Sequence, residues 1–123
     1  MIVGLVKPSR EAIVTLEVRG PSQIAMDIEA ILDTGFTESL TLNRALVGAL
    51  GLRYVNTDDV TLADGSIVGT DLYEGTVLWN GQLRPVIVHC LEGSPLIGMS
   101  LLYDHLLTVE VVDGGPVTID PIP

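Results

Sequence analysis

The sequence predicts an all-β domain with two short helices, and three observations favour this class. The 123 residues are 47% hydrophobic and only 18% charged, as in a compact globular domain. Val, Ile, Leu and Thr dominate, while 13 Gly and 7 Pro interrupt the chain at short intervals, which is typical of β-structure. Asp-Gly and Asn-Gly pairs stand between apolar runs, where they indicate hairpin turns. We expect one domain over residues 1–123.

The first part of the chain is expected to hold four strands and one helix. Thr15, Glu17 and Arg19 alternate with apolar residues, which is the period of a half-buried strand. Asn43 is suited to cap the start of a helix over residues 44–50, and Gly51 to end it. The strands are expected at residues 2–6, 11–19, 24–32 and 40–42.

The rest of the chain is expected to form hairpins around one short helical segment. Ala63-Asp64-Gly65 and Asn80-Gly81 are the predicted turns of two of them, and Asp113-Gly114-Gly115-Pro116 is the turn of a third. One or two helical turns are expected over residues 99–106. The flanking strands are expected at residues 60–62, 66–68, 72–79, 83–91, 108–112 and 117–119.

Charge and cysteine content limit the classes of function. The formal net charge of −10 comes from 16 acidic and 6 basic residues, so the chain repels nucleic acid and anionic membrane surfaces. The charge serves solubility or, alternatively, a preference for basic peptides. One cysteine excludes an intrachain disulfide, and we see no leader or membrane-spanning segment, so we expect a cytoplasmic protein.

The most informative feature is an aspartate that stands where a core strand ends. Asp33 follows an apolar run ending in Ile31-Leu32 and precedes Thr34-Gly35. Burying an unpaired charge is costly, so the carboxyl group must be paired, protonated or used. A second carboxylate sharing a proton would satisfy it, and since the motif occurs once, that carboxylate would come from a second chain. The alternative is an aspartate that only accepts hydrogen bonds from nearby backbone groups.

Three segments in order resemble the signatures of one enzyme family. Asp33-Thr34-Gly35 resembles the active-site loop of aspartic proteases, Ala63-Asp64-Gly65-Ser66 resembles the tip of their flap hairpin, and Leu96-Ile97-Gly98 resembles their second signature. Together they resemble the single-domain, retropepsin-like aspartic proteases over nearly the whole chain. Phe36 after the glycine further resembles a prokaryotic Asp-Thr-Gly-Phe branch of that clan.

The resemblance implies a closed β-barrel with a flap, which acts as a homodimeric peptidase. Asp33 from each chain would form a catalytic dyad, Thr34 would hydrogen-bond across the dimer axis, and Gly35 would allow close backbone approach. One carboxylate of such a coupled pair is ionised and activates water, and the other is protonated. No metal or cofactor is expected, and the substrate is a peptide held as an added strand. The terminal strands are also expected at the dimer interface.

The resemblance also implies the substrate contacts. The flap tip would close over the peptide, unless it is an ordinary surface hairpin. Phe36 would narrow the groove or pack in the core, and the second signature would pack behind the loop and border the substrate. The expected substrate-binding residues are Phe36, Ala63, Asp64, Gly65, Ser66, Leu96 and Ile97.

The sequence departs from the retroviral pattern at an ion pair. The acid two residues after the motif glycine is replaced by Thr37, and the arginine of the second signature by Met99. Two other readings therefore stay open. One is an inactive module of the same fold that binds or dimerises. The other is an enzyme restricted to a single protein partner.

Other candidate sites are weaker. His89 and Cys90 are neighbours on a predicted strand, so their side chains point to opposite faces and cannot form a dyad with each other. Two histidines and one cysteine lack the spacing of zinc ligands. Asp58-Asp59 is predicted to be a solvated loop without a calcium pattern, and Trp79 is predicted to be a packing anchor.

Overall fold

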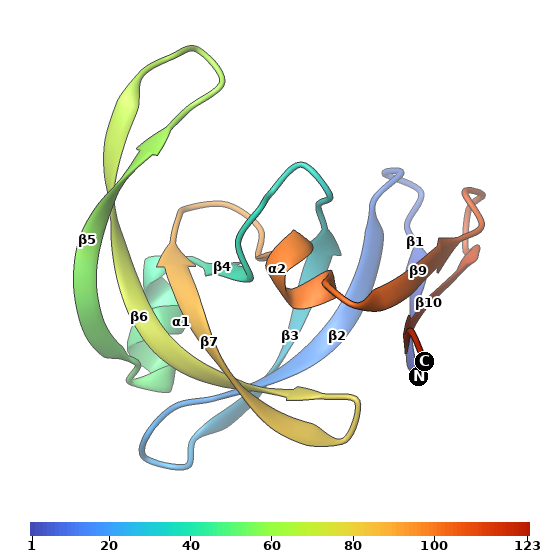
Figure 1. Cartoon of the computed structure of the whole chain (residues 1–123), viewed down its shortest axis with the longest axis horizontal. Coiled ribbons are helices and arrows are strands. Elements are labelled where there is room, and N and C mark those ends of the chain that lie inside the picture. The colour runs from blue at the N-terminus through green and yellow to red at the C-terminus, as the bar shows by residue number, and fades with distance from the viewer.

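The computed structural model describes residues 1–123 and shows ten strands and two short helices (Figure 1). The first five strands are β1 (Ile2–Val6), β2 (Ala12–Arg19), β3 (Ala25–Leu32), β4 (Leu40–Leu42) and β5 (Arg53–Thr61). The other five are β6 (Ile67–Trp79), β7 (Gln82–Cys90), β8 (Leu96–Ile97), β9 (His105–Val109) and β10 (Pro116–Pro121). The helices are α1 (Arg44–Leu50) and α2 (Met99–Leu102).

Six of the strands close into a ring, which is not a regular barrel. The ring runs β6-β7-β4-β8-β3-β2 and is closed where Val18 and Arg19 of β2 pair with Val77 and Thr76 of β6. Two pairings in it are parallel, β3 with β8 and β4 with β7. Strand β5 extends the sheet beyond β6, and β1, β10 and β9 extend it beyond β2. The predicted all-β class is confirmed.

The core fills the ring and follows the predicted alternation. In β2, Val14, Leu16 and Val18 are buried, while the residues between them are not. They belong to one cluster of 20 buried apolar side chains. Since burying a side chain of this size contributes about 1.5–3 kcal/mol, the hydrophobic pattern fixes which face of each strand turns inward.

Helix α1 has the predicted caps. The side chain of Asn43 accepts a hydrogen bond from Leu46 N at 2.9 Å. Gly51 adopts the left-handed conformation with φ 63° and ends the helix. Val47 and Leu50 turn into the core, so the helix docks by one apolar face.

The second helix is shorter than predicted. It ends at Leu102, and strand β9 begins at His105, inside the residues expected to be helical. Tyr103 is extended and Asp104 has φ 64°, so the chain turns out of the helix there. The indole N–H of Trp79 donates to His105 Nε2 at 3.1 Å and holds the new strand in place.

The hairpin of β5 and β6 is longer than predicted. Asp58 and Asp59, predicted to lie in a loop, belong to β5, and Asp58 pairs in register with Thr70. The predicted strands 66–68 and 72–79 form the single strand β6. Nearly every side chain of β5 is exposed, so its sequence carries no apolar alternation by which it could have been recognised.

The two terminal strands pair with each other inside one chain. Ile2–Leu5 of β1 lie antiparallel to Pro116–Ile119 of β10. Strand β9 joins β10, so the hairpin predicted over residues 108–119 is present but starts three residues earlier. None of the helices has the length and apolar character needed to cross a membrane.

Candidate active site

Asp33 stands immediately after β3, where the core strand meets a loop. Its backbone N–H donates to Ile97 O at 2.9 Å, which continues the parallel pairing of β3 with β8. The side chain is half-buried. Its Oδ1 accepts a hydrogen bond from Gly35 N at 2.9 Å, and this contact orients the carboxylate at the head of the loop.

The loop after Asp33 is fastened to the segment around α2. Met99 N donates to Phe36 O at 2.8 Å, and Gly98 N donates to Ser39 O at 3.0 Å. Ser100 Oγ donates to Thr37 O at 2.6 Å. Parallel pairing of β3 and β8 brings the two segments, far apart in sequence, to the same end of the ring.

Gly98 leaves the space that this contact requires. A Cβ atom added to it would overlap Glu38 O and the ring and carbonyl of Phe36. Leu96 N donates to Thr41 Oγ1 at 2.9 Å, so the strand before Gly98 is fixed as well. The side chain of Ile97 is fully buried and therefore supports the loop without lining its surface, and Leu96 is half-buried.

The other loop residues differ in exposure. Thr34 and Gly35 are exposed, and Phe36 is half-buried. The Phe36 ring meets the His89 ring edge-on, with centroids 5.8 Å apart. Phe36 thus both packs against β7 and keeps part of its surface at the loop.

The segment predicted to be a flap tip is a tight, exposed turn between β5 and β6. Asp64 Oδ1 accepts hydrogen bonds from Ser66 N at 2.9 Å and Ser66 Oγ at 2.6 Å, and these contacts lower the pKa of Asp64. Gly65 has φ 85°, a conformation that favours glycine. Ala63 is exposed beside it. Figure 1 shows the hairpin tip and the loop after β3 at the same end of the molecule.

His89 lies against the Asp33 loop through its contact with Phe36, and sequence reasoning missed its environment. It is only 7% exposed, and its Nδ1 has no hydrogen-bond partner. Burial lowers the pKa of His89, while the charges of Glu38 and Asp58 act in the opposite direction. The expected opposition of His89 and Cys90 agrees with their different surroundings, because His89 contacts Phe36 whereas Cys90 is influenced by the charges of Arg44 and Asp71. The signal in the sequence was a lone histidine among apolar strand residues.

The second histidine lies elsewhere. His105 contacts Trp79 and Asn80 at the turn between β6 and β7, and its Nδ1 lies 2.7 Å from Tyr103 O. Trp79 is buried, which confirms it as a packing anchor. No three His, Cys, Asp or Glu side chains lie together as a metal site would require.

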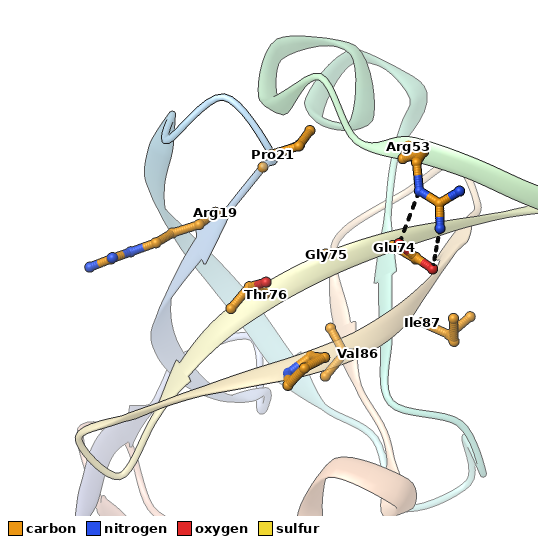
Figure 2. Close-up of a pocket in the computed structure, with 10 residues that line it drawn as sticks. Arg19, Pro21, Arg53, Glu74, Gly75, Thr76, Val86 and Ile87 are labelled. Carbon is orange, nitrogen blue, oxygen red and sulfur yellow. Dashed lines mark hydrogen bonds and ion pairs between the residues drawn. The ribbon is translucent and has the colours of Figure 1, made fainter.

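One cavity is lined by residues outside the Asp33 loop. It has a volume of about 410 Å³ and lies between β2, β6 and β7. Figure 2 shows Arg53 paired with Glu74 at one side of it, and Arg19 pointing away from it. None of the residues predicted for the active site lines it. Both arginines already hold carboxylates of this chain, so the cavity carries no unpaired charge from them.

Comparison with known proteins identifies the fold. The structure resembles a retropepsin-like aspartic protease from Rickettsia conorii with a TM-score of 0.62 and 15% identity, over 94% of this chain and 87% of that one. It resembles the EIAV protease, solved with an inhibitor bound, with a TM-score of 0.61 and 18% identity, over 79% of this chain and 89% of that one. The fold is retropepsin-like. The sequence matches no family model and no curated protein.

The retropepsin-like fold accounts for the position of the two signature segments. Asp33 and Gly98 lie at the ends of the parallel strands β3 and β8. Met99 N and Gly98 N join the two segments by hydrogen bonds to the backbone oxygens of Phe36 and Ser39.

Proposed function

We propose that the protein is an aspartic endopeptidase whose dyad is made of one Asp33 from each chain of a homodimer. The observation that carries this proposal is the position of Asp33, a half-buried carboxylate at the end of a core strand. Its loop is held by backbone hydrogen bonds to the segment around Gly98. A merely structural aspartate needs no such rigid support, whereas a catalytic group does.

The chemistry follows from two carboxylates brought close together. They cannot both ionise easily, so the pair shares one proton. The ionised member takes a proton from a bound water, and the water oxygen attacks the peptide carbonyl carbon. The protonated member gives its proton to the developing oxyanion or to the leaving nitrogen. The carbon–nitrogen bond then breaks, and no metal or cofactor takes part.

The surface beside the loop supports a second chain. Met99 is 45% exposed and Tyr103 is 72% exposed, although the N–H of Met99 is bound to the loop carbonyl of Phe36. Exposed apolar side chains next to a rigid loop fit a protein interface better than open solvent. Thr34 is exposed at the same place, where its hydroxyl would reach the partner loop.

The substrate would lie between the loop and the hairpin tip. We assign the tip, Ala63, Asp64, Gly65 and Ser66, to closure over the peptide, because it is exposed and at the same end of the molecule as Asp33. Closure would exclude water and add the peptide as a strand. Phe36 and Leu96 would border the groove.

A second candidate is a binding module of the same fold without activity. It is favoured by the hydrogen bond from Gly35 N to Asp33 Oδ1, since an aspartate with a local partner can be purely structural. The two candidates differ in what Asp33→Asn does. The amide still accepts the Gly35 hydrogen bond, but it cannot act as a general base.

The deciding experiment is cleavage of a peptide library, read by mass spectrometry, from about pH 4 to about pH 7, the range in which a coupled carboxylate pair changes state. Wild type is compared with Asp33→Asn and with Asp27→Asn, an exposed aspartate on the same strand. We expect cleavage by wild type and Asp27→Asn and none by Asp33→Asn. Folded, dimeric wild type that cleaves nothing would leave the binding module, or an enzyme restricted to a single protein partner, as the function.

A further inference from the structure

One face of the sheet beside Phe36 gathers polar groups that nothing in the chain satisfies. In register, His89 of β7 lies between Thr41 of β4 and Leu72 of β6. Thr70 is two residues from Leu72 and therefore shares its face. Asp58 of β5 lies opposite Thr70. The face thus runs from the loop that carries Phe36 to the predicted flap hairpin.

Two buried polar atoms on this face have no hydrogen-bond partner. They are Thr70 Oγ1 and His89 Nδ1, in side chains that are 1% and 7% exposed. Buried polar atoms are nearly always paired. Two such atoms without partners beside a proposed active site therefore indicate groups kept for a ligand.

The charges around this face are acidic and unpaired. None of the four ion pairs of the chain includes Glu38 or Asp58. Both carboxylates are exposed, and both act electrostatically on the His89 ring, one from the loop and one from β5. Burial outweighs them and lowers the pKa of His89, so the imidazole stays neutral and can accept a hydrogen bond at neutral pH.

We infer that this face is a substrate subsite for a basic side chain, formed by the exposed carboxylates of Glu38 and Asp58 beside the buried, unpartnered side chains of Thr70 and His89. The inference rests on the proposed peptidase function and names the class of peptide that it would cleave. Two carboxylates attract a cation, and a neutral imidazole does not repel it. Arginine is preferred to lysine because its five N–H donors can meet several separate acceptors.

The test uses peptides that differ at one position. A cleaved sequence found for the wild type is made with Arg, Lys, citrulline or Leu at each position near the scissile bond. Citrulline keeps the shape of arginine without its charge. We expect kcat/KM for the Arg peptide to exceed that for the citrulline peptide by about tenfold at one position, as two partly screened charge contacts would give. The preference should shrink as salt is added.

Variants assign the preference to these residues. The double variant Glu38→Gln/Asp58→Asn should lower the Arg-to-citrulline ratio to about one. Asp59→Asn is the matched control, because Asp59 is exposed on the same strand but points to its opposite face. It should keep the wild-type ratio.

The result that would overturn the inference is a wild type that cleaves peptides with no preference for Arg, or a preference that the double variant keeps. Complete inactivity of the wild type would instead remove the proposed function. In that case, binding of fluorescently labelled peptides that carry either Arg or citrulline at one central position is measured on the wild type by fluorescence anisotropy. Tighter binding of the Arg peptide than of the citrulline peptide supports the subsite, and equal binding overturns it.

Discussion

Adding one methyl group to Gly98 tests whether the loop that carries Asp33 is held as described. The backbone of Gly98 has φ −106° and ψ −177°, an extended conformation that any residue can adopt. Its substitution by alanine therefore causes no dihedral strain. The whole cost comes from overlap of the new Cβ with Glu38 O and with Phe36.

The magnitude follows from which atoms must move. Overpacking of a filled site costs about 1–3 kcal/mol, and two of the obstructing atoms are backbone carbonyl oxygens that cannot rotate away. We therefore expect a loss of about 2–3 kcal/mol for Gly98→Ala. Unfolding entropy scaled to 123 residues is about 0.26 kcal/mol per degree. The midpoint Tm should then fall by roughly 8–12 °C.

Gly48 offers the matched control. It lies in α1, is exposed, and an added Cβ would meet nothing within 4 Å. Alanine is favoured over glycine inside a helix by about 0.5–1 kcal/mol, so Gly48→Ala should raise Tm by roughly 2–4 °C. The same glycine-to-alanine substitution is therefore expected to lower Tm at Gly98 and to raise it at Gly48.

The assay is thermal unfolding followed by circular dichroism at one fixed protein concentration, because self-association would shift Tm. Peptidase activity of the same samples is measured below the transition. Since Gly98 touches the loop of Asp33, Gly98→Ala should also reduce activity, whereas Gly48→Ala should not. A Gly98→Ala protein as stable as the wild type would refute the close contact between the two signature segments.

Two further predictions concern buried polar groups. Thr41 and Thr70 are each 1% exposed, but only Thr41 has a partner, since its Oγ1 accepts a hydrogen bond from Leu96 N. Thr41→Val should lower the free energy of unfolding by about 1–3 kcal/mol because it leaves the N–H of Leu96 without a partner, whereas Thr70→Val should be neutral or stabilising. Urea unfolding measures both variants, and equal effects would contradict the reasoning. Because burial lowers the pKa of His89 below the ordinary 6.5, the unfolded chain takes up the proton first as pH falls, so stability should decline below about pH 6.5. Urea midpoints at pH 7.5 and pH 5.5 should differ less in His89→Gln than in the wild type, and an unchanged difference would contradict this origin.

The parts of the fold predicted from the sequence are those with a strong local signal. The alternation in β2 and the caps of α1 at Asn43 and Gly51 depend on residues within a few positions of each other. Asp-Thr-Gly and Leu-Ile-Gly were recognised because each is a short motif that resembles a known signature. Gly98 is the clearest case, because only the absence of a side chain leaves room for Phe36.

The parts that were missed depend on distant contacts. Strand β5 has almost no buried side chain, and it forms because β6 offers a partner edge over its whole length. Strand β9 begins at His105 because Trp79, far away in sequence, holds the histidine ring. No window of sequence contains such information, so the end of α2 was misplaced.

The contacts of the Asp33 loop bear on what a second chain must supply. Thr37 and Met99 stand where the retroviral pattern has an acid and an arginine. The hydroxyl of Ser100 donates a hydrogen bond to the carbonyl of Thr37, and the N–H of Met99 donates one to Phe36 O. Every one of these bonds lies within one chain. In the proposed dimer, the loop would therefore reach this geometry before the two chains associate, and the partner would complete the dyad with its own Asp33.

Salt should strengthen dimer formation without changing the catalytic rate per dimer. Two chains of net charge −10 repel each other, so association should strengthen as salt screens the charges. Because the loop is preformed, the catalytic rate per dimer should stay constant while the dimer fraction rises. Sedimentation and activity measured over one salt series separate the two quantities. A rate per dimer that changes with salt would show that the partner shapes the loop as well as completing the dyad.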